Sequence, residues 1–451
     1  MSSIGAETPE LLSFKDAQTA PVEKGSFLLI LAMLGAWTLL LFVFSTPFRD
    51  THPTLSNLDL VGSSKVLTRL STLAMLLSLN LMMVRKMPIK TGVFYLFGFF
   101  MFAAWAVLTV LWSPLPDVSF GQWVSLFSMT LLGLTIARLV ETDRDAQFVF
   151  LMLGMLFTTR SGIMFMAWAL TGGSGISRLE DSFFHSTDAA ETATLGLLMM
   201  LVCNFGFPTP ITRALFLPSV AILLATFVVA QNRLTVFITP PVAVVVLLMY
   251  GNRNLLVKLA FLGSVGGLLL LIFDPAMESI NAALGSTEDY AVRAGNSERD
   301  FSTLSGRTEL WEAIWRDYIT RPWIGLGFFI TSRTGTVDVW HDPQNYRAHN
   351  QVFQVLATTG AIGLTLFLSG FFLPGKLLLS NLTQPTPAGR IARSVAAVFS
   401  WLILWGLLNS SFCGPINASG ITFWCLLGLT VGRMRQEYLR RETEMKIAAA
   451  K

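Results

Sequence analysis

The sequence predicts an all-α polytopic membrane protein, and three observations lead to this fold class. Hydrophobic residues make up 53% of the 451 residues and charged residues only 13%, whereas soluble domains carry roughly 25% charged residues. The mean hydropathy is +0.59. Apolar runs of roughly 18–23 residues recur along the chain, which is the length that a helix needs to cross a hydrocarbon core about 30 Å thick.

The apolar runs predict about twelve transmembrane helices. Their expected positions are 27–44, 66–84, 92–112, 120–140, 147–170, 189–207, 212–230, 234–250, 255–273, 351–373, 394–412 and 420–432. Arg160 interrupts the fifth run, and Pro240 and Pro241 interrupt the eighth.

Basic residues in the short loops predict the sidedness of the spans, because positively charged short loops stay in the cytoplasm. Three loops fall on one side by this rule, and they contain Arg85, Lys86, Lys90, Arg138, Arg144, Lys376, Arg390 and Arg393. The tail from Arg433 to Lys446 is expected to be a basic helix that lies along anionic headgroups. Both termini are therefore expected in the cytoplasm, and membrane lipids rather than nucleic acid are the expected partners of the tail.

The predicted topology divides the chain into five parts. These are a cytoplasmic N-terminal tail at 1–26, nine spans at 27–273, a large extracytoplasmic loop at 274–350, three spans at 351–432 and a basic cytoplasmic tail at 433–451. The first part mixes acidic and basic residues and lacks the features of a signal peptide, so we expect the first span to remain in the mature protein.

The large loop contains one clear helical pattern, GRTELWEAIWRDYI at 306–319. A single face of this helix carries Leu310, Trp311, Ile314, Trp315 and Tyr318, and Pro322 is expected to stop it. Trp and Tyr at this frequency suit the headgroup interface. The pattern fits an amphipathic lid over a membrane cavity, and a helix that only packs on the loop is the alternative.

Candidate site residues lie where polar segments meet the extracytoplasmic ends of spans. Four clusters have this position: SRLEDSFFHSTDAAETATLG (177–196), QNRLTVF (231–237), SGRTELW (305–311) and RAHNQVF (347–353). Arginines there suit an anionic ligand, because guanidinium groups stay charged and bind phosphate oxygens in pairs. Taken singly, each arginine could instead extend toward lipid headgroups. Arg233 begins a span, where the helix N-terminus adds positive potential for a phosphate.

His349 marks the change from polar to apolar sequence in YRAHNQVFQVLATTGAIG (346–363). A neutral imidazole can act as a general base near neutral pH, and a hydrogen-bonded interface residue is the alternative. Neither the pair His341 and His349 nor the three cysteines have the spacing of a metal site. Asp143 and Asp145 mimic an Asp-x-Asp motif of nucleotide-sugar enzymes, but on a cytoplasmic loop they are expected to cap the fifth span.

Three segments, read in order, resemble the O-antigen ligase and polymerase superfamily of bacterial polysaccharide assembly. They are SGRTELWEAIW, RPWIGLGF and AHNQVFQVLATTGAIGL, within 305–364. Members of that superfamily show a Gly-Arg before a Trp-containing helix, a Pro-x-x-Gly-x-Gly turn and a His-Asn that opens the next span. Weaker echoes occur at WSPLPDVSF and FFHSTDAAETATLG. In the second echo the family more often has a His or Asn followed by Asn, whereas this chain has His185 followed by Ser186.

The resemblance implies an integral-membrane glycosyltransferase of the C-type (GT-C) fold in the bacterial inner membrane. Such an enzyme uses a glycan carried on undecaprenyl diphosphate at the periplasmic face. By analogy His349 deprotonates the acceptor hydroxyl, which attacks the anomeric carbon with inversion. Arg307, Arg233 and Arg178 match diphosphate-binding arginines, with Asn350 and His185 in support. No metal or other cofactor is implied, because arginines can neutralise the leaving group.

Alternatives remain open at two levels. A transporter or lipid flippase would also have many spans and buried arginines such as Arg160, although transporters often show paired halves, and no repeat links 27–250 with 255–432. Among the enzymes, the acceptor could be a lipid A core sugar, the growing glycan or a protein hydroxyl. Because nothing in the sequence points to a lipid A or protein acceptor, a polymerase or exopolysaccharide type is favoured.

Overall fold

A computed structural model of the chain describes residues 60–82, 89–170, 186–230, 232–250, 307–335, 347–409, 412–413 and 416–449. Across these ranges the regular elements are helices and no strand is present, so the predicted all-α class is confirmed. The predicted spans at 27–44 and 255–273 and the N-terminal tail lie outside the described residues, as does most of the large loop.

Most of the described helices overlap the predicted apolar runs, but α15 (Phe372–Leu382) lies almost wholly beyond the predicted end of the tenth run at residue 373. In chain order they are α3 (Leu60–Met82), α4 (Ile89–Tyr95), α5 (Phe97–Leu108), the 3-10 helix η2 (Thr109–Trp112), α6 (Pro116–Leu139), α7 (Asp143–Leu170), α8 (Ser186–Leu201), the π-helix η4 (Val202–Gly206), α9 (Pro210–Ala230), α10 (Arg233–Met249), α13 (Arg307–Tyr318), α14 (Gln351–Ser369), α15 (Phe372–Leu382), α16 (Pro387–Leu408), α17 (Ala418–Leu429), the π-helix η6 (Thr430–Met434) and α18 (Arg435–Ala449).

The length and hydropathy of these helices make the chain a multi-pass membrane protein. Among the described residues, 6 helical segments are long and apolar enough to cross a membrane, and α4 together with α5 and η2, bent by 81°, would make a seventh. Shorter apolar helices lie at Val66–Met82 and Phe237–Met249. A total of about twelve spans therefore stays a prediction.

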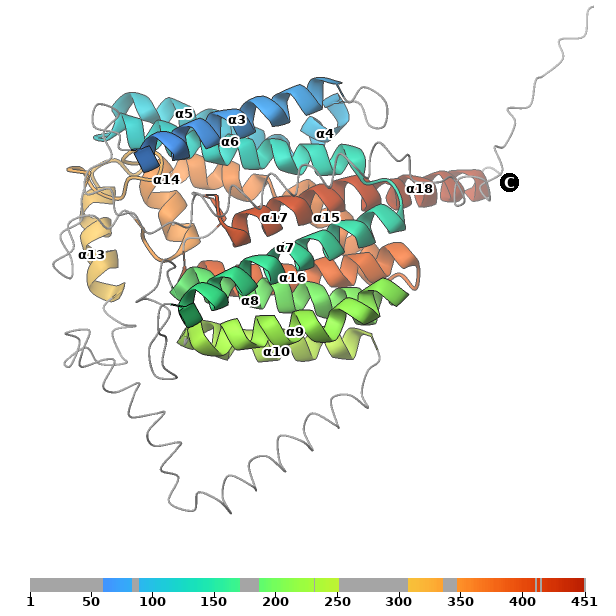
Figure 1. The fold of residues 1–451 in the computed structure, drawn as a ribbon. Helices are drawn as coiled ribbons and strands as arrows, with labels where there is room; N and C mark the ends of the chain where they lie inside the picture. Colours follow the sequence, from blue (N-terminus) through green and yellow to red (C-terminus); the bar gives the residue numbers. More distant parts are fainter. Residues whose placement is uncertain are drawn as a thin grey trace, which may run out of the picture.

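The helices form one bundle with α17 at its centre (Figure 1). Every residue of α17 is buried, and the helix packs against α6 and α8. Small residues allow this close approach: a Cβ at Gly428 would overlap the carbonyl oxygen of Gly133 on α6, and Gly432 lies as close to Val140. This is the small-residue packing by which helices associate inside membranes.

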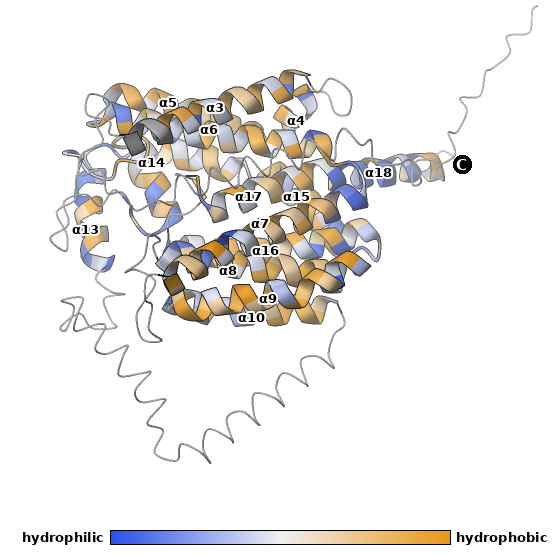
Figure 2. Cartoon of the chain, viewed as in Figure 1, coloured by the Kyte–Doolittle hydropathy of each residue, from blue (hydrophilic) through white to orange (hydrophobic). Residues whose placement is uncertain are grey.

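The periphery of the bundle is apolar where a membrane would surround it. On α9, Leu217 is 73% exposed and Val228 is 69% exposed, as expected for side chains that face hydrocarbon. Hydrophilic residues gather instead along α13 and α18, which lie at opposite ends of the bundle (Figure 2). These two ends are called the α13 end and the α18 end below.

The start of α7 confirms one predicted cap. Asp145 accepts hydrogen bonds from the backbone N–H groups of Thr142 (2.9 Å) and Glu141 (3.1 Å), and the Thr142 hydroxyl accepts the N–H of Asp145 at 3.2 Å. This reciprocal arrangement is a capping box. Asp143 instead pairs with Arg433, with 2.7 Å between Oδ1 and Nε. The Asp-x-Asp pair is therefore structural in both members.

The basic tail is helical, as predicted. Helix α18 continues the direction of α17 past the end of the bundle (Figure 1) rather than turning to lie across it. Its first turns are anchored by Arg441, which donates to Oδ1 of Asn381 on α15 at 2.6 Å, while the buried carboxylate of Glu437 pairs with Arg440 within the helix at 2.6 Å. These contacts hold α18 in line with the bundle.

A break in α14 receives the turn that follows α13. Gly360 has φ +71° and ψ −176° inside α14, which leaves backbone groups on both sides of it without helical partners. The carbonyls of Ala357 and Thr358 accept the N–H groups of Leu326 (3.1 Å) and Gly327 (3.0 Å). Beyond the break, the N–H groups of Ala361 and Ile362 donate to the carbonyls of Pro322 (2.9 Å) and Trp323 (3.2 Å).

The glycines of the motif are required by this docking. Gly325 (φ +71°) and Gly327 (φ +127°) both have left-handed backbones, and a Cβ on either would collide with Thr358 or Ser113. The other side of the turn rests on η2: the indole of Trp112 donates to the carbonyl of Gly325 at 3.2 Å. The Pro-x-x-Gly-x-Gly segment thus forms hydrogen bonds with the backbone groups of α14 that the break leaves without helical partners.

The break predicts a sharp contrast between two glycines. Gly360→Ala should destabilise the protein by about 3 kcal/mol or more, because an L-residue is strained at this φ and ψ and its Cβ would overlap the carbonyl of Trp323. Gly375→Ala, in α15 with no atom within 4 Å of the added Cβ, should be neutral or stabilise by up to about 1 kcal/mol. Thermal unfolding in detergent, followed by tryptophan fluorescence, compares the two; equal melting temperatures would contradict the role given to the break.

Candidate functional site

His349 has a constrained backbone. Its φ is +49°, a left-handed conformation that few residues other than glycine adopt. The preceding peptide is held from both sides, since the N–H of Ala348 donates to Oε1 of Gln354 (2.6 Å) and the carbonyl of Ala348 accepts the indole N–H of Trp311 (2.6 Å). Side chains from α13 and α14 therefore fix the direction in which the side chain of His349 projects from the backbone.

Asn350 is the N-cap of α14. Its side-chain oxygen accepts the N–H of Phe353 at 2.9 Å, and its carbonyl accepts the N–H of Gln354 at 2.8 Å. The polar-to-apolar change seen in the sequence is thus the first turn of a helix. His349 lies directly before that turn, where the helix dipole contributes positive potential.

Arg307 begins α13, beside the start of α14. It is partly buried, and this burial lowers the pKa of its guanidinium, which stays cationic because the ordinary value is so high. One turn further on, Trp311 bonds to the residue before His349. Thr308, the neighbour of Arg307, and Asn350, the neighbour of His349, line the same groove. The structure therefore brings these two predicted site residues to one end of α13.

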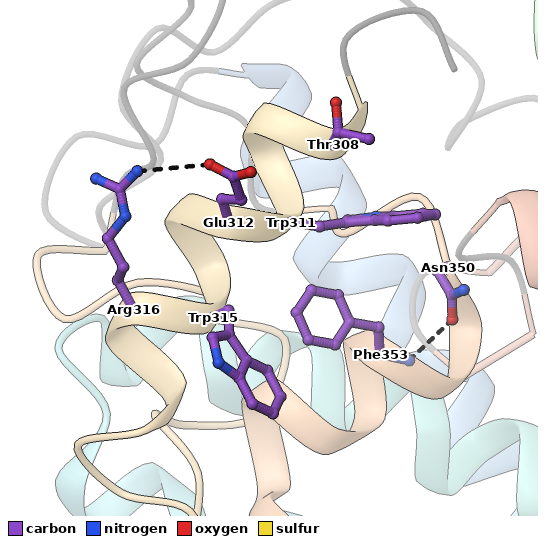
Figure 3. Close-up of a pocket in the computed structure, with 7 residues that line it drawn as sticks. All are labelled: Thr308, Trp311, Glu312, Trp315, Arg316, Asn350 and Phe353. Atoms are coloured by element: carbon purple, nitrogen blue, oxygen red, sulfur yellow. Dashed lines mark hydrogen bonds and ion pairs between the residues drawn. The ribbon is translucent and has the colours of Figure 1, made fainter. Parts of the chain in front are cut away.

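The groove lies between α13 and the first turn of α14 (Figure 3). Its volume is about 560 Å³. The lining residues are Thr308, Trp311, Glu312, Trp315, Arg316, Asn350 and Phe353. The ring of Phe353 lies edge-on to that of Trp311 (6.4 Å between centroids, 77°) and nearly parallel to that of Trp315 (6.3 Å, 28°). Glu312 and Arg316 form an exposed ion pair with 3.8 Å between nitrogen and oxygen.

The other predicted site residues are only partly placed. Arg233 is the first residue of α10, and the oxygen of Asn232 caps that helix by accepting the N–H of Thr235 at 3.1 Å. The backbone of Arg233 therefore occupies a capped helix N-terminus as predicted, while its side chain lies outside the described part. Arg178 and His185 also lie outside the described residues.

The structure adds a buried charged cluster that was not predicted. Arg160, 3% exposed within α7, donates to the hydroxyl of Thr192 on α8 and interacts electrostatically with Asp188 and Glu191. Glu191, 2% exposed, accepts the N–H of Ser419 at the start of α17, at 2.6 Å. The cluster ties α7, α8 and α17 together. Its sequence signal was a carboxylate inside FFHSTDAAETATLG paired with an arginine inside a span.

A second tie fixes the start of α14 to the segment before α17. The side-chain oxygen of Gln351 accepts the N–H groups of Phe412 (3.1 Å) and Cys413 (3.4 Å). Sequence patterns carry no sign of this contact, because the partners are distant in the chain and one of them is backbone. The first turn of α14, next to His349, is thereby fastened to the central helix of the bundle.

These observations define an all-α membrane protein whose candidate site lies at one end of the bundle, between α13 and α14. Residues 218–368, from α9 to the last turn of α14, match the family model described as O-Antigen ligase. The match confirms the resemblance to the O-antigen ligase and polymerase superfamily, and it includes both His349 and Arg307. A comparison with curated proteins gives no significant match. The match to this part of the chain supports, in general terms, glycan transfer of the ligase or polymerase kind.

The clamp on Ala348 can be tested through Gln354. Gln354→Leu should leave the buried N–H of Ala348 without its acceptor, at an expected cost of about 1–3 kcal/mol. Gln354→Glu keeps an acceptor oxygen at the same place and should retain more of the stability. Thermal unfolding in detergent measures both variants, and a Leu variant that melts with the wild type would show that this hydrogen bond does not hold the segment.

Proposed function

We propose that the protein is an inverting membrane glycosyltransferase of the polymerase type. It joins a glycan carried on undecaprenyl diphosphate to a hydroxyl of an acceptor glycan at the periplasmic face of the bacterial inner membrane. The observation that carries this proposal is the hydrogen bond between Trp311 and Ala348, because it places the helix that begins with Arg307 against the residue before His349.

His349 is the general base of the proposed reaction. It takes the proton of the acceptor hydroxyl, whose oxygen forms a bond to the anomeric carbon of the donor while the bond from that carbon to the diphosphate oxygen breaks. The electron pair leaves with the diphosphate, and the configuration at the carbon inverts. A clamped backbone suits this role, since a base acts only when it is held within hydrogen-bond reach of the hydroxyl.

The arginines hold the leaving diphosphate. Arg307 and Arg233 each stand at the first turn of a helix, where main-chain N–H groups and the helix dipole add to the charge of the side chain. Arg178 is the third candidate, and Asn350 and His185 complete the set, Asn350 through its cap on α14. Fixed cations stabilise the charge that develops on the leaving group, so no metal ion is required by the proposal.

The orientation follows from the distribution of charge. Arg138, Arg433, Arg440 and Arg441 lie near the α18 end, and basic residues favour the cytoplasm. The α18 end and the C-terminus are then cytoplasmic, and the α13 end with its groove faces the periplasm; a cytoplasmic N-terminus is the expectation from the sequence. A base at this level can meet a sugar in water while the lipid tail of the donor stays in the membrane.

The transporter hypothesis rested on Arg160. Its contacts with Thr192 and with the Glu191 and Asp188 carboxylates link packed helices, which supports a fixed scaffold better than a moving carrier. Reconstitution separates the two functions: bond formation between donor and acceptor supports the enzyme, whereas movement of lipid-linked glycan without a new bond supports the transporter. Accumulation of single repeat units after gene deletion would support a polymerase over a ligase or a protein glycosyltransferase.

The proposed base gives the sharpest test. His349→Asn should lower transfer by a factor of about 10³ or more, because the imidazole is lost, while the fold stays intact because Asn tolerates the left-handed backbone. His349→Gly is the matched variant that accepts the same φ without any side chain. Transfer is measured with lipid-linked donor in liposomes, and near wild-type rates in the Asn variant would rule out His349 as the base.

Arg307→Lys tests the diphosphate site. The charge survives but the forked pair of donors is lost, so transfer should fall by about tenfold or more, with melting temperature unchanged. Arg321→Lys is the control, since Arg321 is an exposed arginine of the same segment whose guanidinium donates to the carbonyl of Trp112 at 3.3 Å. Equal transfer rates in the two variants would count against phosphate binding by Arg307.

A further inference from the structure

The groove beside His349 presents more aromatic surface than the packing of α13 requires. Leu310, Ile314 and Tyr318 already bury the inner face of this helix against α14. Trp315 stands outside this cluster with 49% of its surface exposed, and its ring packs on Tyr318 and Phe353. Large apolar surfaces left open in a concave site mark binding sites more often than packing.

The rim of the groove is polar. Glu312 and Arg316, whose side chains are 72% and 77% exposed, pair across the outer turn of α13, and Thr308 and Asn350 stand at the inner end (Figure 3). The site thus combines ring faces with carboxylate, guanidinium, hydroxyl and amide groups. A pyranose ring has the complementary construction, since its C–H faces pack on aromatic rings and its hydroxyl groups donate and accept hydrogen bonds at the edge.

We infer that this groove binds sugar residues of the acceptor glycan, an assignment that rests on the proposed function. The acceptor is favoured over the donor because the inner end of the groove is Asn350, the residue after His349, and the proposed base must reach an acceptor hydroxyl. From Thr308 to Arg316 the helix rises by about 12 Å, which is enough for a short run of linked rings.

A lipid occupant fits the groove less well. Helix α13 lies at the end of the bundle rather than beside the spans (Figure 1). An isoprenoid chain in the groove would leave the ion pair of Glu312 and Arg316 against hydrocarbon, where charges are costly. A glycan that approaches from water keeps both charges solvated or hydrogen-bonded.

Trp315 is the residue to vary, because Trp311 also supports the peptide before His349. Trp315→Ala should raise the KM for the acceptor glycan about tenfold, a loss in the range found when a ring-stacking partner is removed, and leave the KM for the lipid-linked donor unchanged. Trp315→Phe keeps a ring and should recover most of the affinity. The matched control is Trp323→Ala, a tryptophan 69% exposed but outside the groove.

Three outcomes of this assay would overturn the assignment. The first is an acceptor KM that is unchanged in Trp315→Ala. The second is a rise in the donor KM of that variant instead of the acceptor KM. The third is a rise in the acceptor KM of Trp323→Ala as large as that of Trp315→Ala. The last would mean that exposed tryptophans of this segment anchor it in the headgroup layer.

A binding measurement separates this inference from the reaction itself. The probe is the repeat-unit oligosaccharide that mild acid releases from the lipid-linked donor of the host cell, added to the full-length protein in nanodiscs. His349→Asn should bind it as tightly as the wild type, and Trp315→Ala about tenfold more weakly. This pattern would uphold the groove even if His349 proved dispensable for transfer. Equal binding by Trp315→Ala and the wild type would refute the groove even if His349 proved essential.

Discussion

The hydrogen bonds between the broken helix α14 and the turn after α13 are the constraint on which the site depends. At the level of a membrane, a helix interrupted in its middle exposes N–H and C=O groups that water cannot reach, and each such group costs several kcal/mol. The turn at 322–327 satisfies these groups on both sides of Gly360, and the indole of Trp105 donates to the carbonyl of Thr359 at 2.8 Å. The break is therefore stable only with the turn in place.

This constraint reaches the candidate site through α13. The turn fixes the end of α13, the buried residues Leu310 and Ile314 set its rotation against α14, and Trp311 is then directed at the carbonyl of Ala348. Each of these contacts restricts the position of the next group. His349 has a left-handed backbone because it joins two fixed groups. The peptide before it is held by hydrogen bonds, and Asn350 after it caps α14.

The sequence allowed the helices and the order of the motifs to be predicted, because a hydrocarbon core imposes a length on apolar runs and because α13 repeats its apolar residues at helical spacing. It did not reveal the break in α14. In the sequence, Gly360 is one more small residue in an apolar run. The backbone groups on either side of it bond to residues more than thirty positions away in the chain, and such distant contacts cannot be predicted from helical periodicity. The contacts of α18 could not be predicted for a related reason: charge composition indicates a basic helix, whereas the burial of Glu437 depends on its position against the bundle.

Within the site, sequence analysis identified the residues whose type alone suggests a chemical role, such as His349 and Arg307. The residues that position them were overlooked, because Trp311 and Gln354 act through one indole or amide contact with backbone. The same holds for Glu191, whose carboxylate meets the N-terminus of α17. A carboxylate there is favourable, since free N–H groups and the helix dipole compensate its charge, and Arg160 adds a counter-charge from α7. The buried charges of Arg160 on α7 and Glu191 on α8 thus serve to hold helices together, whereas Arg307 at the start of α13 is the described cation that the proposed function assigns to an anionic substrate.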